Sequence, residues 1–199
     1  MVQGRQRPFF YAIMTGYKRN AMADTHGAAA SGQRAEKKLR ERVVSMGFHY
    51  IRTQVDAAKY LGIPLTPGGK VRKKDIPRIN EWLEGKVNFE APEEYKEADF
   101  GRFESDGYVP ELDSILELKA GDKAGTTEEK IFFDLEKMRD KCYGDRTVLY
   151  IFEGSKEQDK NTKLFKAKVK KGQAQGTINQ NVYVLDNSVM TKEVLMECK

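Results

Sequence analysis

Histidine and cysteine are scarce in this chain of 199 residues, which contains two of each. Cys142 and Cys198 lie far apart in the sequence, so neither a disulfide framework nor a cysteine-based zinc site is indicated. His26 and His49 are the only histidines, which excludes histidine-ligated metal centres and His-based catalytic triads. A reduced, intracellular protein is the simplest expectation.

Long apolar runs are also missing. No stretch approaches the roughly 20 apolar residues that cross a membrane, and the N-terminus lacks the apolar core of a signal peptide. We therefore expect a cytoplasmic protein with no membrane partner. The hydrophobic content of 39% and charged content of 33% fit one globular domain of ordinary size.

Positive charge exceeds negative charge by five, and the basic residues are clustered. One cluster spans Arg34 to Arg42 and another spans Lys156 to Lys171. A third consists of Lys70, Arg72, Lys73 and Lys74. Such clusters suit a polyanion such as double-stranded DNA. The 156–171 stretch fits equally well a solvated surface strand, because its lysines alternate with Leu164, Ala167 and Val169.

Two carboxylates and an amine fall on a predicted β-hairpin. Phe103–Val109 is predicted as one strand, Pro110–Ser114 as the turn and Ile115–Lys119 as the returning strand. Side chains alternate across a strand, so Glu117 and Lys119 share one face and the adjacent leucines share the other. The pairing can then bring Asp106 next to Glu117.

Adjacent carboxylates repel unless a cation lies between them, and oxygen ligands favour Mg²⁺, with Mn²⁺ as a substitute. Asp106 and Glu117 are therefore candidate metal ligands, and the backbone carbonyl of Leu118 is a candidate third. A bound metal would make a phosphodiester accessible to a water nucleophile. Lys119 would hold and deprotonate that water, or offset charge in the transition state.

These residues resemble the motif of the PD-(D/E)xK nuclease superfamily, which includes type II restriction endonucleases, Holliday-junction resolvases and mismatch nicking enzymes. Asp106 matches the first acid, Glu117 the second and Lys119 the lysine. Ser105 departs from the proline of the nominal motif. Asp113 competes for the place of the first acid, but its position before Glu117 suits the turn better.

A helix is predicted upstream of the hairpin, over Gly32–Met46, from apolar residues at helical spacing. Glu36 lies on the flank of its apolar face. Superfamily members often carry such a helix with a glutamate that reaches the metal through water, so Glu36 is the candidate fourth catalytic residue. Glu41, or a Glu36 that is merely exposed, remains an equal alternative.

Downstream, residues 120–125 are predicted as a loop, and Thr126 with Glu129 forms a capping box for a helix that ends near Gly144. A buried strand over Thr147–Phe152 follows. This order of elements is that of the superfamily core: an α/β fold in which helices flank a central mixed sheet. The resemblance covers about residues 32–153.

The remaining segments complete the expected domain. Residues 1–31 are predicted as a flexible leader and residues 32–199 as one nuclease domain, with its first strand at Phe48–Thr53. Asn181–Leu185 is predicted as a strand and Thr191–Cys198 as a terminal helix.

A helical insertion is expected at residues 54–98. Helices at Gln54–Gly62 and Asp75–Leu83 are similar to the helix-turn-helix units of excisionase and MerR-like proteins, which would place the Lys70–Lys74 cluster on DNA. Helices that merely pack on the sheet are an equal alternative. Glu90–Asp99 is predicted as a solvated linker.

The resemblance implies a Mg²⁺-dependent DNA endonuclease of the restriction type that leaves a 5′-phosphate and a 3′-hydroxyl. A homodimer would suit a palindromic site. Two alternatives stay open: a structure-specific resolvase or nicking enzyme, and a non-catalytic DNA-binding protein that uses its helix-turn-helix-like segment.

Overall fold

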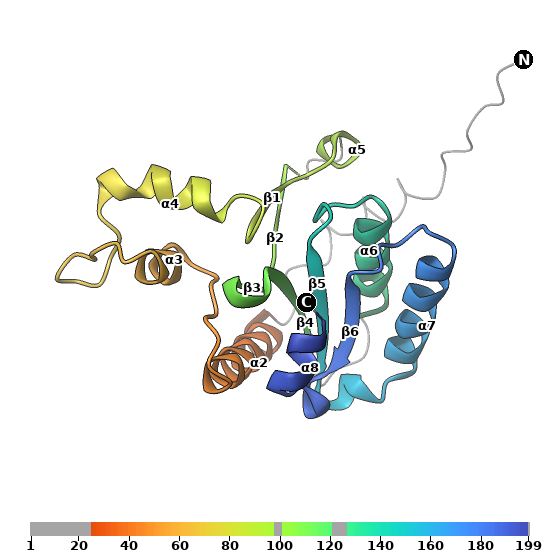
Figure 1. The fold of residues 1–199 in the computed structure, drawn as a ribbon. Helices are drawn as coiled ribbons and strands as arrows, with labels where there is room; N and C mark the ends of the chain where they lie inside the picture. Colours follow the sequence, from red (N-terminus) through yellow and green to blue (C-terminus); the bar gives the residue numbers. More distant parts are fainter. Residues whose placement is uncertain (1–24, 98–100, 121–126, 199) are drawn as a thin grey trace, which may run out of the picture.

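The computed structural model of the chain describes residues 25–97, 101–120 and 127–198, and of residues 25–31 and 127–130 it describes the backbone alone (Figure 1). Most of the expected leader, the expected loop after Lys119 and the capping threonine Thr126 lie outside the described residues.

A mixed four-stranded sheet forms the centre of the molecule (Figure 1). In spatial order, its strands are β3 (Gly107–Val109), β4 (Ser114–Ala120), β5 (Thr147–Glu153) and β6 (Val182–Asp186). β3 is antiparallel to β4, whereas β4, β5 and β6 are mutually parallel. β5 is apolar from Val148 to Phe152 and buried along that run, as a parallel strand covered on both faces requires.

Helices cover both faces of this sheet. The helices that connect its parallel strands, α6 (Thr127–Arg139) and α7 (Lys160–Ala174), supply Leu135 and Phe165 to one buried cluster. α2 (Thr25–Ser45) and the terminal α8 (Lys192–Glu197) supply Leu39 and Leu195 to a second cluster on the opposite face. Because successive strand residues point to opposite faces, Ile115 joins the first cluster and Leu116 the second. The predicted α/β class with a helix-flanked mixed sheet is confirmed.

The expected insertion is helical and extends to one side of the sheet, at the left of Figure 1. It contains α3 (Gln54–Tyr60), the 3-10 turn η1 (Lys73–Asp75) and α4 (Ile76–Leu83). Thr53 caps α3 in a capping box with Asp56. Buried Ala58 and Ile79 belong to the same apolar cluster as the sheet, so the insertion packs on the core.

Residues 61–75 separate α3 from α4, a longer connection than the tight turn of a helix-turn-helix. Short elements then lead back to the main sheet: β1 (Asn88–Glu90), α5 (Glu93–Lys96) and β2 (Arg102–Glu104). β1 and β2 pair in a small antiparallel sheet of their own. The expected linker at Glu90–Asp99 is therefore partly wrong, because Tyr95 within it is buried and donates a hydrogen bond to the Asp140 carboxylate.

The single strand expected over Phe103–Val109 is two strands, since β2 pairs with β1 and β3 pairs with β4. The break falls at buried Ser105. Its N–H donates to the carbonyl of Val87 (2.9 Å) and its hydroxyl to the carbonyl of Gly107 (3.2 Å). These bonds fix a bend in the chain between β2 and β3. Asp106 lies at this bend, which we call the corner.

Three further expectations differ from the structure. The Phe48–Thr53 strand is reduced to one bridge, in which Ile51 and Tyr108 exchange backbone hydrogen bonds. The last residues of the expected flexible leader, 25–31, are helical, since α2 begins at Thr25. The basic 156–171 stretch is helical rather than a strand: Lys156 lies in the 3-10 turn η3 (Gly154–Glu157), and α7 begins at Lys160. In α7, Phe165 and Val169 are buried one helical turn apart.

Candidate active site

The β3–β4 register brings the predicted acids together. Gly107 pairs with Leu116, so Asp106, one residue before β3, lies at the position facing Glu117. Glu117 is 3% exposed and belongs to the face of β4 that α6 covers, whereas Leu116 packs on the opposite face. The predicted alternation of side chains along this strand is confirmed.

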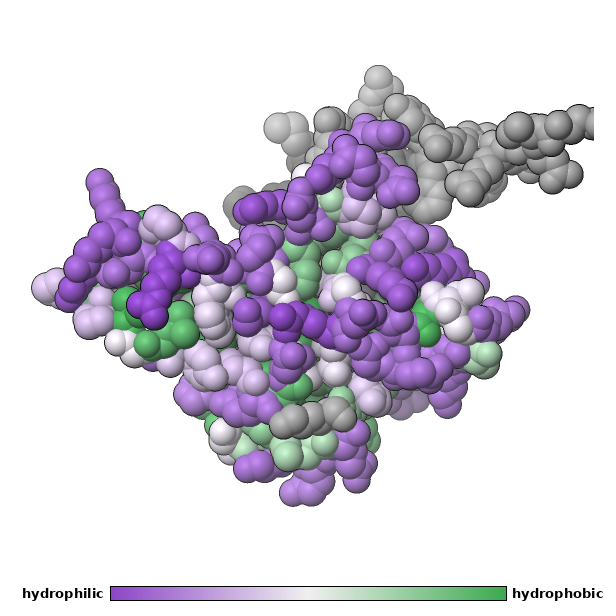
Figure 2. All heavy atoms as spheres, turned by 45° about the horizontal axis from the view of Figure 1, so that its top comes forward, coloured by the Kyte–Doolittle hydropathy of each residue, from purple (hydrophilic) through white to green (hydrophobic). Residues whose placement is uncertain are grey.

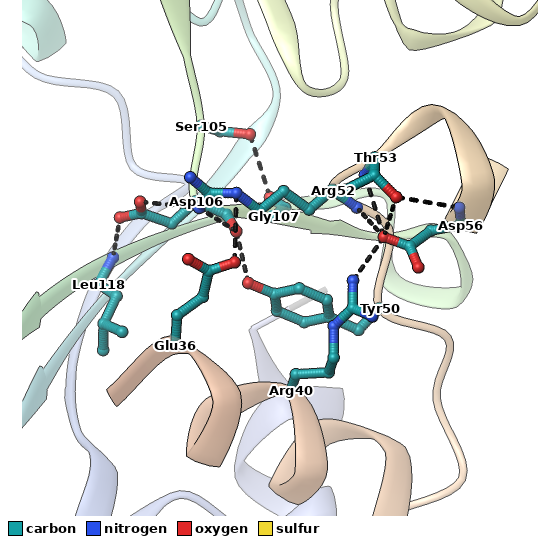
Figure 3. Close-up of polar contacts among 10 residues, drawn as sticks. All are labelled: Glu36, Arg40, Tyr50, Arg52, Thr53, Asp56, Ser105, Asp106, Gly107 and Leu118. Atoms are coloured by element: carbon teal, nitrogen blue, oxygen red, sulfur yellow. Dashed lines mark hydrogen bonds and ion pairs between the residues drawn. The ribbon is translucent and has the colours of Figure 1, made fainter. Parts of the chain in front are cut away.

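Asp106 is held at the corner by several hydrogen bonds (Figure 3). Its Oδ2 accepts from the backbone N–H of Leu118 (2.7 Å), and its Oδ1 accepts from Nη1 of Arg52 (3.2 Å). Its backbone carbonyl accepts from the Tyr50 hydroxyl. Burial, followed by the negative charge of Glu117, raises the pKa of Asp106. Ionisation of Asp106 and Glu117 at the same time is therefore unfavourable, even with the positive charge of Arg52 beside Asp106.

Glu36 reaches the same site from α2 (Figure 3). Its Oε1 pairs with Nε of Arg52 at 3.2 Å, so one guanidinium joins Glu36 to Asp106. The alternative, Glu41, pairs instead with Lys37 on the solvent side of α2 at 3.8 Å. Of the two acids on this helix, Glu36 is thus the one beside Asp106.

Arg52 was not predicted from the sequence as a site residue. It follows the Ile51 bridge to Tyr108, and that bridge fixes its distance from the hairpin. No motif surrounds it, and the only usable signal was an isolated arginine at the end of the expected first strand.

Glu117 and Lys119 lie in a buried ion network whose other members come from α6 and the turn after it. Lys119 Nζ lies 3.1 Å from Glu117 Oε2 and 2.9 Å from Asp134 Oδ2. Lys137 Nζ lies 3.1 Å from Asp134 Oδ1 and donates to the Tyr143 hydroxyl at 2.7 Å. That hydroxyl in turn donates to Glu117 Oε1. Two acids and two lysines thus balance one another inside the protein.

This network sets the protonation states. Burial alone would raise the pKa of Glu117, but Lys119 and Lys137 hold it below its usual value. Burial would lower the pKa of Lys119, but Asp134, Glu117 and Asp106 outweigh that effect and raise it. Lys119 is therefore an ammonium, which favours the predicted role of offsetting charge over that of taking a proton from water.

Asp106 and Glu117 offer carboxylate oxygens, the type of ligand that hard divalent cations prefer. Asp106 and Glu117 occupy facing positions, and burial, followed by the charge of Glu117, raises the pKa of Asp106. Each carboxylate oxygen has two lone pairs, so oxygens that already accept one hydrogen bond retain capacity for a ligand bond. Within the described ranges, no group of three or more His, Cys, Asp or Glu side chains is arranged to hold a metal.

The Lys70–Lys74 cluster lies away from this site, in the insertion. All four of its basic side chains are exposed, and none forms an ion pair with another residue that the structure describes. The face shown in Figure 2 is mostly hydrophilic, with small separated apolar areas, one of them over the α3–α4 unit.

Comparisons of the chain with models of protein families, with curated proteins and with solved structures found no match. Among the described residues, no helix has both the length and the apolar character needed to span a membrane.

Proposed function

We propose that this protein is a divalent-metal-dependent DNA endonuclease of the PD-(D/E)xK type, with a restriction-endonuclease-like core and sequence-specific cleavage of double-stranded DNA. One observation carries the proposal: the hairpin register sets Asp106 opposite Glu117, with Lys119 two residues further along the same strand. Glu36 joins this group through Arg52. The helix-flanked mixed sheet beneath it is the scaffold that the motif requires.

In the proposed reaction, Asp106 and Glu117 would hold Mg²⁺ or Mn²⁺, with the carbonyl of Leu118 as the further candidate ligand. The bound cation would neutralise phosphate charge and lower the pKa of a water nucleophile. Lys119, kept as an ammonium by Asp134 and Glu117, offsets charge on the phosphate in the transition state. Arg52 orients the Asp106 carboxylate, and Glu36 fixes Arg52.

Double-stranded DNA suits the charge distribution of the chain. The exposed Lys70–Lys74 cluster supplies phosphate contacts beside the inserted helices. Cleavage of both strands at a palindromic site would need two copies of the site, for which a symmetric homodimer is the simplest arrangement.

The test is incubation of the purified chain with unmethylated plasmid or phage DNA in Mg²⁺ or in EDTA. Asp106→Asn is the informative variant, because an asparagine oxygen can still accept the Leu118 hydrogen bond whereas the carboxylate charge is removed. We expect discrete fragments that require Mg²⁺ and disappear in Asp106→Asn. A preference for branched over linear DNA would point to the resolvase alternative.

A second function, non-catalytic DNA binding, is favoured by the ion network itself. Both oxygens of Glu117 already contact protein donors, as expected of an arrangement that only stabilises the fold. That function predicts DNA binding that survives Asp106→Asn and no metal-dependent cleavage of linear, branched or single-stranded DNA. Such a result would overturn the endonuclease proposal.

A further inference from the structure

A cavity of about 280 Å³ lies between the start of α3, the end of α4 and the small β1–β2 sheet. Its position follows from the insertion, whose helices stand beside the main sheet (Figure 1). The lining residues that matter here are Arg52, Gln54, Asn80, Leu83, Val87 and Asn88.

The cavity combines an apolar floor with amide groups. Leu83 and Val87 are buried and contribute apolar surface. Gln54 Nε2 donates to Asn80 Oδ1 at 2.6 Å, which fixes these two amides side by side. The Asn80 amino group and the Gln54 carbonyl then have no partner in the described part of the chain, and neither has the side-chain amide of Asn88. An apolar surface with a paired donor and acceptor at its edge matches a flat heterocycle with polar edges.

Arg52 connects this cavity to the candidate active site. It lines the cavity and, from the same side chain, pairs with Asp106 at 3.2 Å (Figure 3). Ser105, which also lines the cavity, directly precedes Asp106. A ligand in the cavity would therefore lie beside the carboxylates at which a phosphodiester would be hydrolysed.

We propose that the cavity binds one unstacked nucleobase of the substrate, adenine by preference, adjacent to the phosphate that is cleaved; this proposal rests on the endonuclease function. A base inside a duplex has both faces covered by its neighbours, so a hollow can receive it only after it leaves the stack. Adenine is the base whose N6 donor and N7 acceptor pair with an asparagine or glutamine amide. The phosphate attached to that base then reaches the Asp106 corner.

The proposal is tested with nucleosides, which carry no phosphodiester and so do not depend on cleavage. Asparagine and glutamine side-chain amide signals of the ¹⁵N-labelled full chain are followed by NMR during titration with deoxyadenosine, deoxycytidine, deoxyguanosine or thymidine, each up to about 20 mM. We expect saturable shifts of the Gln54, Asn80 and Asn88 amides, largest with deoxyadenosine. Asn80→Ala should weaken deoxyadenosine binding about tenfold.

Gln175→Ala, which removes an exposed amide just after α7, is the matched control and should leave binding unchanged. Saturable shifts with deoxyadenosine but no cleavage of any DNA would support the base site and overturn the endonuclease. Metal-dependent cleavage without saturable amide shifts for any nucleoside would overturn the base site alone. A stronger response to another nucleoside than to deoxyadenosine would contradict the adenine assignment.

Discussion

Glu117 contributes both to the stability of the fold and to the candidate active site. It is almost fully buried, and its charge is balanced by Lys119 and Lys137. Removing one member of a buried ion pair usually costs about 3–5 kcal/mol, because the other charge is left uncompensated. An alanine at this position would therefore test folding as much as catalysis. Asp106, which is partly exposed at the rim, separates the two effects better.

The raised pKa of Asp106 gives a pH dependence with a definite sign. A carboxyl whose folded pKa exceeds its unfolded value contributes stability below the unfolded pKa, near 3.8, and that contribution is lost as pH rises through the folded value. Asp106→Asn removes the ionisable group, so this loss of stability with rising pH should not occur in the variant. We therefore expect the variant to gain stability relative to the native chain from about pH 4 to pH 7. Urea unfolding across that range measures the difference.

Glu41→Gln is the control for this comparison, since Glu41 is an exposed acid on α2. This variant measures what the loss of one exposed negative charge does to stability over the same range, and the gain of Asp106→Asn should exceed its effect. If Asp106→Asn gains no more than Glu41→Gln, burial and the charge of Glu117 do not raise the pKa of Asp106 as described.

Among the elements, the β3–β4 hairpin is closely packed at Gly107, where an added side-chain atom would meet Tyr50. A Cβ on Gly107 would lie 2.8 Å from Cζ of Tyr50. The Tyr50 ring is buried, and Cζ of Arg40 lies 5.1 Å from the centre of that ring. The Tyr50 hydroxyl donates a hydrogen bond to the Asp106 carbonyl. Tyr50 therefore cannot move without releasing the corner that carries Asp106.

We expect Gly107→Ala to destabilise the protein by about 1–3 kcal/mol, the usual cost of overpacking a close contact. Gly68→Ala is the matched control, because nothing lies within 4 Å of its Cβ position. That variant should stay within about 0.5 kcal/mol of the native chain. Chemical denaturation of both proteins measures the difference in stability. Equal stabilities would show that Tyr50 moves away from the added methyl group at no cost in stability.

Elements with a regular apolar period were predictable from the sequence, whereas those set by tertiary contacts were not. α6 follows from its apolar spacing and β5 from its continuous apolar run, and the alternation of side chains along a strand places Glu117 and Lys119 on one face. The break at Ser105 was not predictable, because it depends on a hydrogen bond to Val87, which is distant in sequence. α7 was not predicted, since its lysines alternate as in a strand and only its buried residues recur every helical turn.

The candidate site was partly predictable for the same reason. Asp106, Glu117 and Lys119 are close together in sequence, and their hairpin pairing follows from local rules. Arg52, Asp134, Lys137 and Tyr143 come from other elements, and only the packing of α6 and the Ile51 bridge bring them in.

For the whole molecule, two of the three basic clusters lie in well-separated regions. The Lys70–Lys74 cluster lies in the insertion at one side of the sheet and the exposed lysines of α7 lie at the other (Figure 1). The two groups allow a comparison in which equal charge is removed from different places.

Alanine at all four basic positions of the Lys70–Lys74 cluster should weaken DNA binding in EDTA. The slope of log K against log salt should fall by about 0.9 for each phosphate that the variant no longer neutralises, and so by up to about 4. Fluorescence anisotropy with mixed-sequence DNA at several NaCl concentrations measures this slope. The matched control removes four exposed α7 charges: Lys160, Lys163, Lys170 and Lys171. An equal reduction of the slope in both variants would mean that net charge, and not the insertion, attracts DNA.

The ion network has a consequence for tracing the ancestry of this chain. The charges of Glu117 and Lys119 are balanced by Lys137 and Asp134, and Tyr143 donates a hydrogen bond to Glu117, so the strand pair and the helix cannot diverge independently. Substitutions on one side should be accompanied by compensating substitutions on the other. A composite signature, Glu-x-Lys followed by Asp-x-x-Lys and a tyrosine six residues after that lysine, should therefore identify distant relatives in genome sequences more selectively than the short motif alone.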